Sequence, residues 1–204
     1  RSGGERRRGG GVGARAGALA CRSDGGPLND EVTRLLRAVP ALEAASGVRL
    51  AIIGGVVRGV WAPARNTVDV DVIAGTTDLA SVVAAASAGG LVVHAPDLEK
   101  MAHSGMARLR LPEHLTGRVR LDIIAATHPY YERVLARARD VGVVDMTVHV
   151  ASAEDIVVLK IMADRPQDRA DVAAILKAQG TALDRDVVRA ELAVLGFDVP
   201  AELR

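Results

Sequence analysis

Two aspartates are separated by a single residue in an otherwise apolar segment, where residues 68–73 read VDVDVI. This alternation of acidic and β-branched residues predicts a β-strand, in which side chains two positions apart project from the same face. Carboxylates that lie so close repel each other and raise each other's pKa unless a cation lies between them. Oxygen ligands without cysteine or paired histidine favour Mg²⁺ or Mn²⁺ over zinc. We therefore expect Asp69 and Asp71 to hold a divalent metal ion, since a solvated loop would not alternate in this way.

A pair of glycines, Gly54 and Gly55, precedes these acids in the chain. The pair follows an apolar segment over 48–53 that predicts a buried strand, and it leads into a short helix predicted over 56–61. Because glycine has no Cβ, backbone N–H groups at the start of that helix can approach an anion closely. A Gly-Gly pair alone more often forms an ordinary turn, but its place ahead of paired acids indicates a phosphate site.

A third acid, Asp122, lies within the apolar residues 119–124, which read VRLDII. An aspartate in such a strand is costly unless a cation or a hydrogen-bond network compensates its charge. The alternative interpretation is a strand-end aspartate paired with an arginine. Three acids together with a glycine anion site indicate two-metal phosphoryl-transfer chemistry.

The elements needed to position these residues form an α/β pattern. Periodicity and turn signals predict a first helix from Asn29 to Gly47 and a later strand pair over 107–111 and 118–125. Further strands are expected over 91–94, 141–144 and 147–150, and further helices over 78–87, 130–139, 153–163, 167–178 and 185–195. The predicted fold is an α/β (α+β) mixed β-sheet flanked by helices. Its expected divisions are a disordered basic tail over 1–27, a core over 28–151 and a helical C-terminal part over 152–204.

Composition and charge exclude several classes of protein. The 204 residues include only 2% aromatic side chains, which argues against modules that stack bases on aromatic platforms. The sequence carries 26 basic and 25 acidic residues, but six arginines lie in residues 1–22, so the remainder is mildly acidic and unlike a general nucleic-acid binder. A basic arm that touches RNA is the alternative reading of this Gly/Arg-rich tail.

Cysteine usage and hydropathy bear on the compartment. Cys21 is the only cysteine, so the sequence offers no internal disulfide and no cysteine-based metal site, which fits a reducing cytoplasm. The longest charge-free stretch, 79–96, is broken by serines and a glycine pair and does not predict a membrane span. We expect a cytoplasmic protein without a signal peptide or anchor.

The glycine and aspartate motifs together resemble a known family. Residues 53–58 (IGGVVR) and 65–72 (RNTVDVDV) resemble the signature of the polymerase-β-like nucleotidyltransferase superfamily, in which a glycine turn precedes a strand with two acids and a third acid follows. The Arg-X-Thr-X-Asp-X-Asp form resembles the minimal AbiEii/MenT-type nucleotidyltransferases. A second segment, from Ser152 to Asp171, is similar to the helices of that family that carry the pattern EDLxxxKxxAxRxxDxxD.

The resemblance implies a nucleotidyltransferase-like fold and roles for individual residues. Asp69 and Asp71 would hold the metals, and Asp122 would complete the triad and act as the base. The implied nucleotide-binding residues are Gly54, Gly55, Arg65, Thr67, Lys160 and Asp168. By spacing alone, Lys160 is a surface lysine on an amphipathic helix, and Arg165, Asp168 and Asp171 form a salt-bridged helix start. Two departures stand out: Gly55 replaces a frequent serine, and Gly59 breaks the motif of CCA-adding enzymes, whose activity we exclude.

The function implied by the resemblance is metal-dependent transfer of a nucleoside monophosphate from a nucleoside triphosphate to an acceptor hydroxyl. The acceptor would be an RNA 3′ end, such as that of tRNA, or a protein, and the chain would act as the toxin of a toxin–antitoxin pair with a cognate antitoxin. The alternative is a catalytically inactive protein of the same fold that binds a nucleotide or a partner.

Overall fold

The computed structural model describes residues 29–93, 104–143 and 145–204. The predicted tail over 1–27, the end of the predicted strand at His94 and position 144 lie outside the described residues.

The described strands form one mixed sheet of seven strands, which confirms the predicted fold class. Their order across the sheet is β3-β4-β5-β2-β1-β7-β6. The strands are β1 (Leu50–Ile53), β2 (Asp69–Ala74), β3 (Val92–Val93), β4 (Met106–Arg110), β5 (Arg120–Ala125), β6 (Arg139–Val143) and β7 (Met146–Val150). The predicted pairings of β4 with β5 and of β6 with β7 are confirmed, and both are antiparallel.

The centre of the sheet brings together segments that are distant in sequence. β2 pairs antiparallel with β1 on one side and parallel with β5 on the other. One face of β2 and β5 is wholly apolar, with Val70, Val72, Leu121 and Ile123 all buried. The opposite face carries the charged residues, because side chains alternate along each strand. Burial of the apolar face therefore orients the acids of both strands in the same direction.

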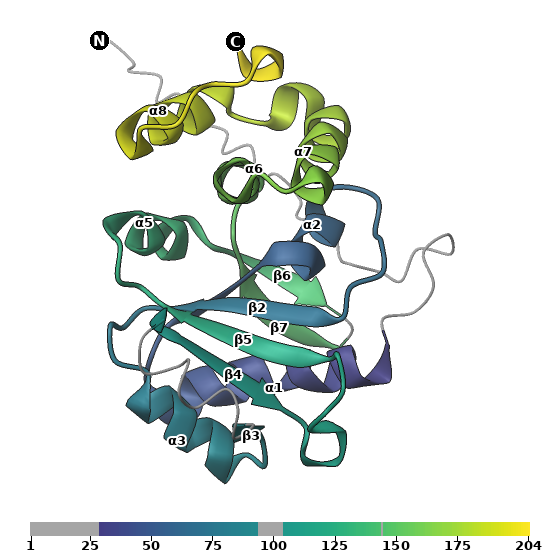
Figure 1. Ribbon diagram of the computed structural model, residues 1–204, viewed down its shortest axis with the longest axis vertical. Helices are drawn as coiled ribbons and strands as arrows, with labels where there is room; N and C mark the ends of the chain where they lie inside the picture. The colour runs from purple at the N-terminus through teal and green to yellow at the C-terminus, as the bar shows by residue number, and fades with distance from the viewer. Residues whose placement is uncertain (1–28, 94–103, 144) are drawn as a thin grey trace, which may run out of the picture.

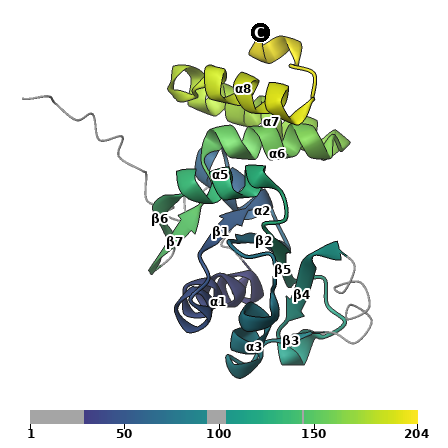
Figure 2. The same cartoon turned by 90° about the vertical axis from the view of Figure 1, so that its left-hand side faces the viewer.

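Helices cover both faces of this sheet (Figures 1 and 2). The helices are α1 (Asp30–Ser46), α2 (Gly54–Trp61), α3 (Ala80–Ala88), α5 (Pro129–Arg137), α6 (Ala153–Ala163), α7 (Pro166–Gln179) and α8 (Arg185–Leu195). α1 and α3 lie on one side of the sheet, whereas α2, α5 and the C-terminal helices lie on the other (Figure 2). Among the described residues, no helix has the length and apolar character needed to cross a membrane.

Local signals account for the helix boundaries. The side chain of Asn29 accepts a hydrogen bond from the backbone of Glu31 at the start of α1, and Gly47 ends that helix in the left-handed conformation. The hydroxyl of Ser152 caps α6 by accepting from the N–H of Asp155. One boundary differs: α2 begins at Gly54, two residues before its predicted start, because the glycine pair itself forms the first turn.

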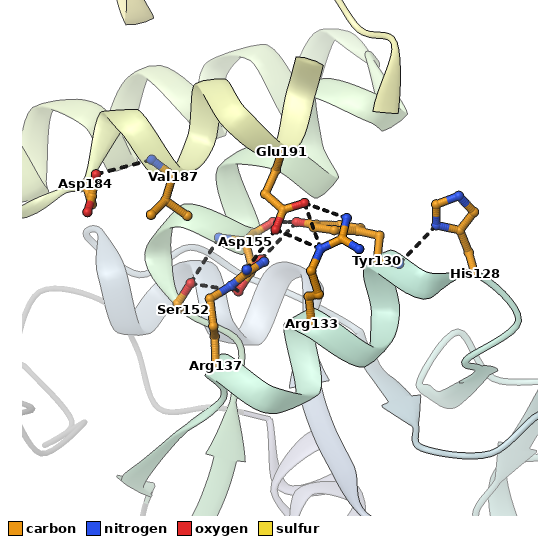
Figure 3. A network of polar contacts seen from close by, with 9 residues as sticks. All are labelled: His128, Tyr130, Arg133, Arg137, Ser152, Asp155, Asp184, Val187 and Glu191. Carbon is orange, nitrogen blue, oxygen red and sulfur yellow. Dashed lines mark hydrogen bonds and ion pairs between the residues drawn. The ribbon is translucent and has the colours of Figure 1, made fainter. Parts of the chain in front are cut away.

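A buried polar network joins α5 to α6 and α8 (Figure 3). The carboxylate of Asp155 is 0% exposed and accepts hydrogen bonds from the hydroxyls of Tyr130 and Ser152, at 3.0 and 2.9 Å. Arg137 donates to the same carboxylate from two nitrogens, at 2.5 and 3.0 Å, and also to Glu191 on α8 at 2.7 Å. The network therefore holds α6, the helix that carries Lys160, against α5.

Candidate active site

The three predicted acids lie on one face of two adjacent strands. In the parallel pairing of β2 with β5, Asp71 stands opposite Asp122 and Asp69 stands opposite Arg120. Neighbouring strands lie about 4.8 Å apart, so facing side chains on these strands are close neighbours. The structure thus brings together Asp69, Asp71 and Asp122 as the sequence led us to expect.

The glycine turn closes one side of this group of acids. Gly54 has a φ of +72°, and a Cβ added there would lie 2.1 Å from a carboxylate oxygen of Asp71. A Cβ at Gly55 would lie 2.7 Å from the hydroxyl of Thr67. The left-handed backbone of Gly54 therefore favours glycine, whereas a side chain at Gly55 would displace the Thr67 hydroxyl. The N–H groups of the first turn of α2 start beside the acids, where they can bind an anion.

Electrostatic repulsion is concentrated on Asp71. Burial, followed by the charges of Asp122 and Asp69, raises the pKa of Asp71 to about 6. Burial also raises the pKa of Asp69, although Arg120 opposes that shift. The Oδ1 atom of Asp69 is buried and has no hydrogen-bond partner among the described residues. The pair therefore offers buried, repelling oxygens of the kind that a divalent cation stabilises.

Asp122 is neutralised differently. Its carboxylate is 5% exposed and accepts two hydrogen bonds of 2.8 Å from Arg108 on β4. Arg120 donates to the same carboxylate at 3.1 Å and to Asp69 at 2.9 Å. The aspartate–arginine pairing that the sequence left open as the alternative is therefore present, although Asp122 lies inside β5 and not at its end.

The sequence interpretation missed Arg108 and Arg120 as neighbours of the acids. Arg108 stands directly opposite Asp122 in the antiparallel pairing of β4 with β5. The signal for Arg120 was its place two residues before Asp122 in an alternating strand, which puts both on one face. No comparable signal marks Arg108, because its proximity depends on the register between two strands.

Residues of α6 and α7 form a second charged cluster. Lys160 donates to Asp168 and lies 2.8 Å from both Asp168 and Asp171. Lys160 is only 6% exposed, so the interpretation as a surface lysine is wrong. Asp171 in turn binds Arg65 at 3.0 Å and Arg58 at 3.1 Å.

This second cluster lies beside the glycine turn. A guanidinium nitrogen of Arg65 lies 3.8 Å from the position that a Cβ at Gly55 would occupy. Burial would raise the pKa of Asp168, but hydrogen bonds from Arg165 and Lys160 outweigh it and hold that pKa below its usual value. The side chain of Arg165 is 73% exposed, and its charge only partly offsets the rise that burial and the neighbouring acids cause in the pKa of Asp71. The predicted Arg165–Asp168 pair at the helix start is present.

The fit of a metal ion differs among the three acids. Within residues 29–93, 104–143 and 145–204, no three acidic, histidine or cysteine side chains are arranged as a ready metal site. Asp69 and Asp71 fit a divalent cation, because one oxygen of Asp69 is orphaned and the charge of Asp71 is destabilised by its acidic neighbours. Asp122 would have to lose hydrogen bonds from Arg108 and Arg120 before its carboxylate could bind a metal ion.

Solved structures of other proteins share this fold. A crystal structure of ANT(2″)-Ia in complex with adenylyl-2″-tobramycin matches with a TM-score of 0.57 and 17% identity, over 82% of this chain and 99% of that one. An antigenic nucleotidyltransferase-like protein from Paracoccidioides brasiliensis matches with a TM-score of 0.55 and 18% identity, over 83% and 89% of the two chains. At these identities the likeness establishes the nucleotidyltransferase fold.

The sequence itself assigns the family. The family described as nucleotidyltransferase of unknown function (DUF6036) matches residues 37–190, which include the glycine turn, all three acids and the cluster around Lys160. The chain therefore belongs to the DUF6036 nucleotidyltransferase family. No curated protein matches it.

The charge of Asp71 should make the metal-free site a source of instability. Because the pKa of Asp71 is raised from 3.8 to about 6 in the folded state, the free energy of unfolding falls as pH rises above 3.8. The loss is complete above pH 6. At pH 7 with a chelator, Asp71→Asn should therefore stabilise the fold by about 2 kcal/mol, and the gain should vanish near pH 3.5. Urea unfolding at both pH values measures this effect. A loss of stability at pH 7 would contradict the repulsion described above.

Proposed function

We propose that this protein transfers a nucleoside monophosphate from a nucleoside triphosphate to an acceptor hydroxyl. The observation that supports the proposal is the close approach of the Gly54 turn to Asp71, which lies on the same face of β2 as Asp69, so that a phosphate bound at the turn would lie next to a cation held by the two acids. Family membership and the fold of the structural neighbours support nucleotidyl transfer in general terms.

In this proposal each residue of the site has a separate role. The N–H groups at Gly54 and Gly55 bind the triphosphate, and Asp69 and Asp71 would hold Mg²⁺ or Mn²⁺. When bound, such an ion neutralises charge on the phosphates and on the leaving pyrophosphate. Asp122 accepts the proton of the acceptor hydroxyl once its bonds to Arg108 and Arg120 are exchanged.

The cluster around Lys160 holds residues next to the glycine turn, where the triphosphate would bind. Lys160 holds Asp168 and Asp171, and Asp171 holds Arg65 next to Gly55. This chain of ion pairs positions the guanidinium of Arg65 against the glycine turn, and the hydroxyl of Thr67, which donates to the backbone carbonyl of Asp69, lies beside the same turn. We propose that Lys160 and Asp168 act mainly by fixing this arrangement.

The finer assignment rests on the sequence resemblance to AbiEii/MenT-type enzymes. It would make the chain a cytoplasmic toxin that modifies RNA, such as tRNA, or a protein, and that is neutralised by an antitoxin. Co-transcription with a small regulator gene would favour this assignment.

A second candidate function is binding without catalysis. The bidentate pairing of Arg108 with Asp122 favours it, because a carboxylate held in this way is not available as a base.

One experiment separates the two candidates. The protein is incubated with each α-³²P-labelled nucleoside triphosphate and bulk RNA, with Mg²⁺ or with EDTA. Magnesium-dependent label on RNA or protein is the expected result. Saturable nucleotide binding without transfer would favour the second candidate, and the absence of both would refute the proposed function.

A further inference from the structure

The third acid of the site already has a cation beside it. Arg108 on β4 stands opposite Asp122 on β5, and its guanidinium donates from two nitrogens to the two carboxylate oxygens, each at 2.8 Å. Bidentate pairs of this kind are among the strongest that an arginine forms with a carboxylate. Asp122 is only 5% exposed, so water competes little for its oxygens. Arg108 therefore occupies the carboxylate that would complete a three-acid metal site.

The two oxygens of Asp122 are held differently. Within the described part of the chain, Oδ1 accepts from Arg108, whereas Oδ2 accepts from Arg108 and, at 3.1 Å, from Arg120. Arg120 also donates to Asp69 at 2.9 Å, so two carboxylates hold its guanidinium in place. The side chain of Arg108 is 24% exposed, which gives its guanidinium a path to solvent. Loss of the Arg108 contact would therefore make Oδ1 of Asp122 available while Arg120 stays bound.

The balance of charge at the acids determines how many metal ions the site can accept. The three acids bring three negative charges, and Arg108 and Arg120 place two positive charges in contact with them. The remaining negative charge is concentrated at Asp71, whose pKa is raised by burial and by the neighbouring acids. This balance suits one divalent cation. A second cation at Asp122 would meet the guanidinium of Arg108, which repels it at short range.

We propose that Arg108 competes with a metal ion for Asp122, so that its guanidinium and a divalent cation bind this carboxylate in turn and never together. While Arg108 is bound, the site holds one ion through Asp69 and Asp71, and it gains a second only when Arg108 turns away. The inference rests on the proposed function, since it concerns the metal ions of nucleotidyl transfer. It goes beyond that function by naming a residue of this chain that keeps the site in a one-metal state.

Binding of Mn²⁺ alone, followed by the electron paramagnetic resonance signal of the free ion, tests the competition. Arg108→Gln should tighten Mn²⁺ binding about tenfold and add a second ion per chain, because the repelling charge is removed and Oδ1 of Asp122 is released. Arg110→Gln is the matched control, since Arg110 lies on the same face of β4 and donates to the Gly117 carbonyl at 2.6 Å. It removes an equal charge without releasing Asp122, so the number of bound ions should not change.

A double variant that combines Arg108→Gln with Asp122→Asn keeps the test decisive if Arg108→Gln alone does not fold. It replaces the ion pair with two uncharged amides and leaves the net charge of the site unchanged. Because Asp122 holds no ion while Arg108 is bound, the double variant should bind Mn²⁺ as the unmodified protein does. Loss of Mn²⁺ binding in the double variant would overturn the inference. An unchanged affinity and ion count in folded Arg108→Gln would also overturn it.

A separate measurement distinguishes failure of this inference from failure of the proposed function. The unmodified protein should bind a fluorescent nucleoside triphosphate more tightly with Mn²⁺ than with EDTA. If it does so and Arg108→Gln leaves Mn²⁺ binding unchanged, only the competition at Asp122 is refuted and the proposed function stands. If the unmodified protein shows no Mn²⁺-dependent binding of the triphosphate, the proposed function itself is refuted.

Discussion

Asp69→Asn is expected to reduce nucleotidyl transfer by about a thousandfold or more without unfolding the protein. The amide has the size of the carboxylate but lacks its charge, so it is a poor ligand for a hard divalent cation. The orphaned Oδ1 atom of Asp69 is one of the two oxygens that this substitution alters. Loss of one preorganised electrostatic group commonly costs about 10²–10³ in rate, and loss of a metal would add to that cost.

Transfer of label from an α-³²P-labelled triphosphate, measured with saturating Mg²⁺, checks this prediction. Asp145→Asn is the matched control, because Asp145 is exposed and pairs with Arg37 away from the site. Its activity should equal that of the unmodified protein. Thermal unfolding of both variants reports whether the fold is intact. If the turnover of Asp69→Asn were within tenfold of that of the control, Asp69 would not be a catalytic residue.

Asp155→Ala is expected to lower the free energy of unfolding by about 3–5 kcal/mol, which is the largest effect on stability that we predict. The substitution leaves the guanidinium of Arg137 and the hydroxyl of Tyr130 without their buried acceptor (Figure 3). Arg137 keeps its bond to Glu191, so the cost arises from the loss of several charge-assisted hydrogen bonds to one fully buried carboxylate. Since α6 carries Lys160, we also expect weaker binding of the triphosphate.

Urea denaturation followed by circular dichroism measures this loss. Tyr130→Phe removes only one hydrogen bond of the network and should cost about 1–2 kcal/mol, so it remains informative if Asp155→Ala does not fold. Asp164→Asn is the control, because Asp164 is exposed, pairs with Arg169 at the surface and has a left-handed backbone that asparagine tolerates, so it should cost less than about 1 kcal/mol. Equal losses in Asp155→Ala and Asp164→Asn would show that the network does not anchor α6.

The elements that carry the site were largely predictable from the sequence. Helices α6 and α8 have the bounds 153–163 and 185–195 that periodicity and caps predicted. The alternating pattern of β2 predicted that Asp69 and Asp71 project from the same face of the strand, and that of β5 predicted a charged face that carries Asp122. The glycine pair predicted a close approach of the backbone to its neighbours, which the structure shows at Asp71. These features depend on residues within a few positions of each other, so local sequence determines them.

Only the tertiary structure decided which charges meet. The register between β4 and β5 places Arg108 opposite Asp122 and thereby decides how the third acid is neutralised. The packing of α7 on α6 buries Lys160 between two aspartates, although its spacing is that of a surface lysine. Such contacts join residues whose separation along the chain says nothing about their distance, because strand order and helix packing are set by burial of the whole core.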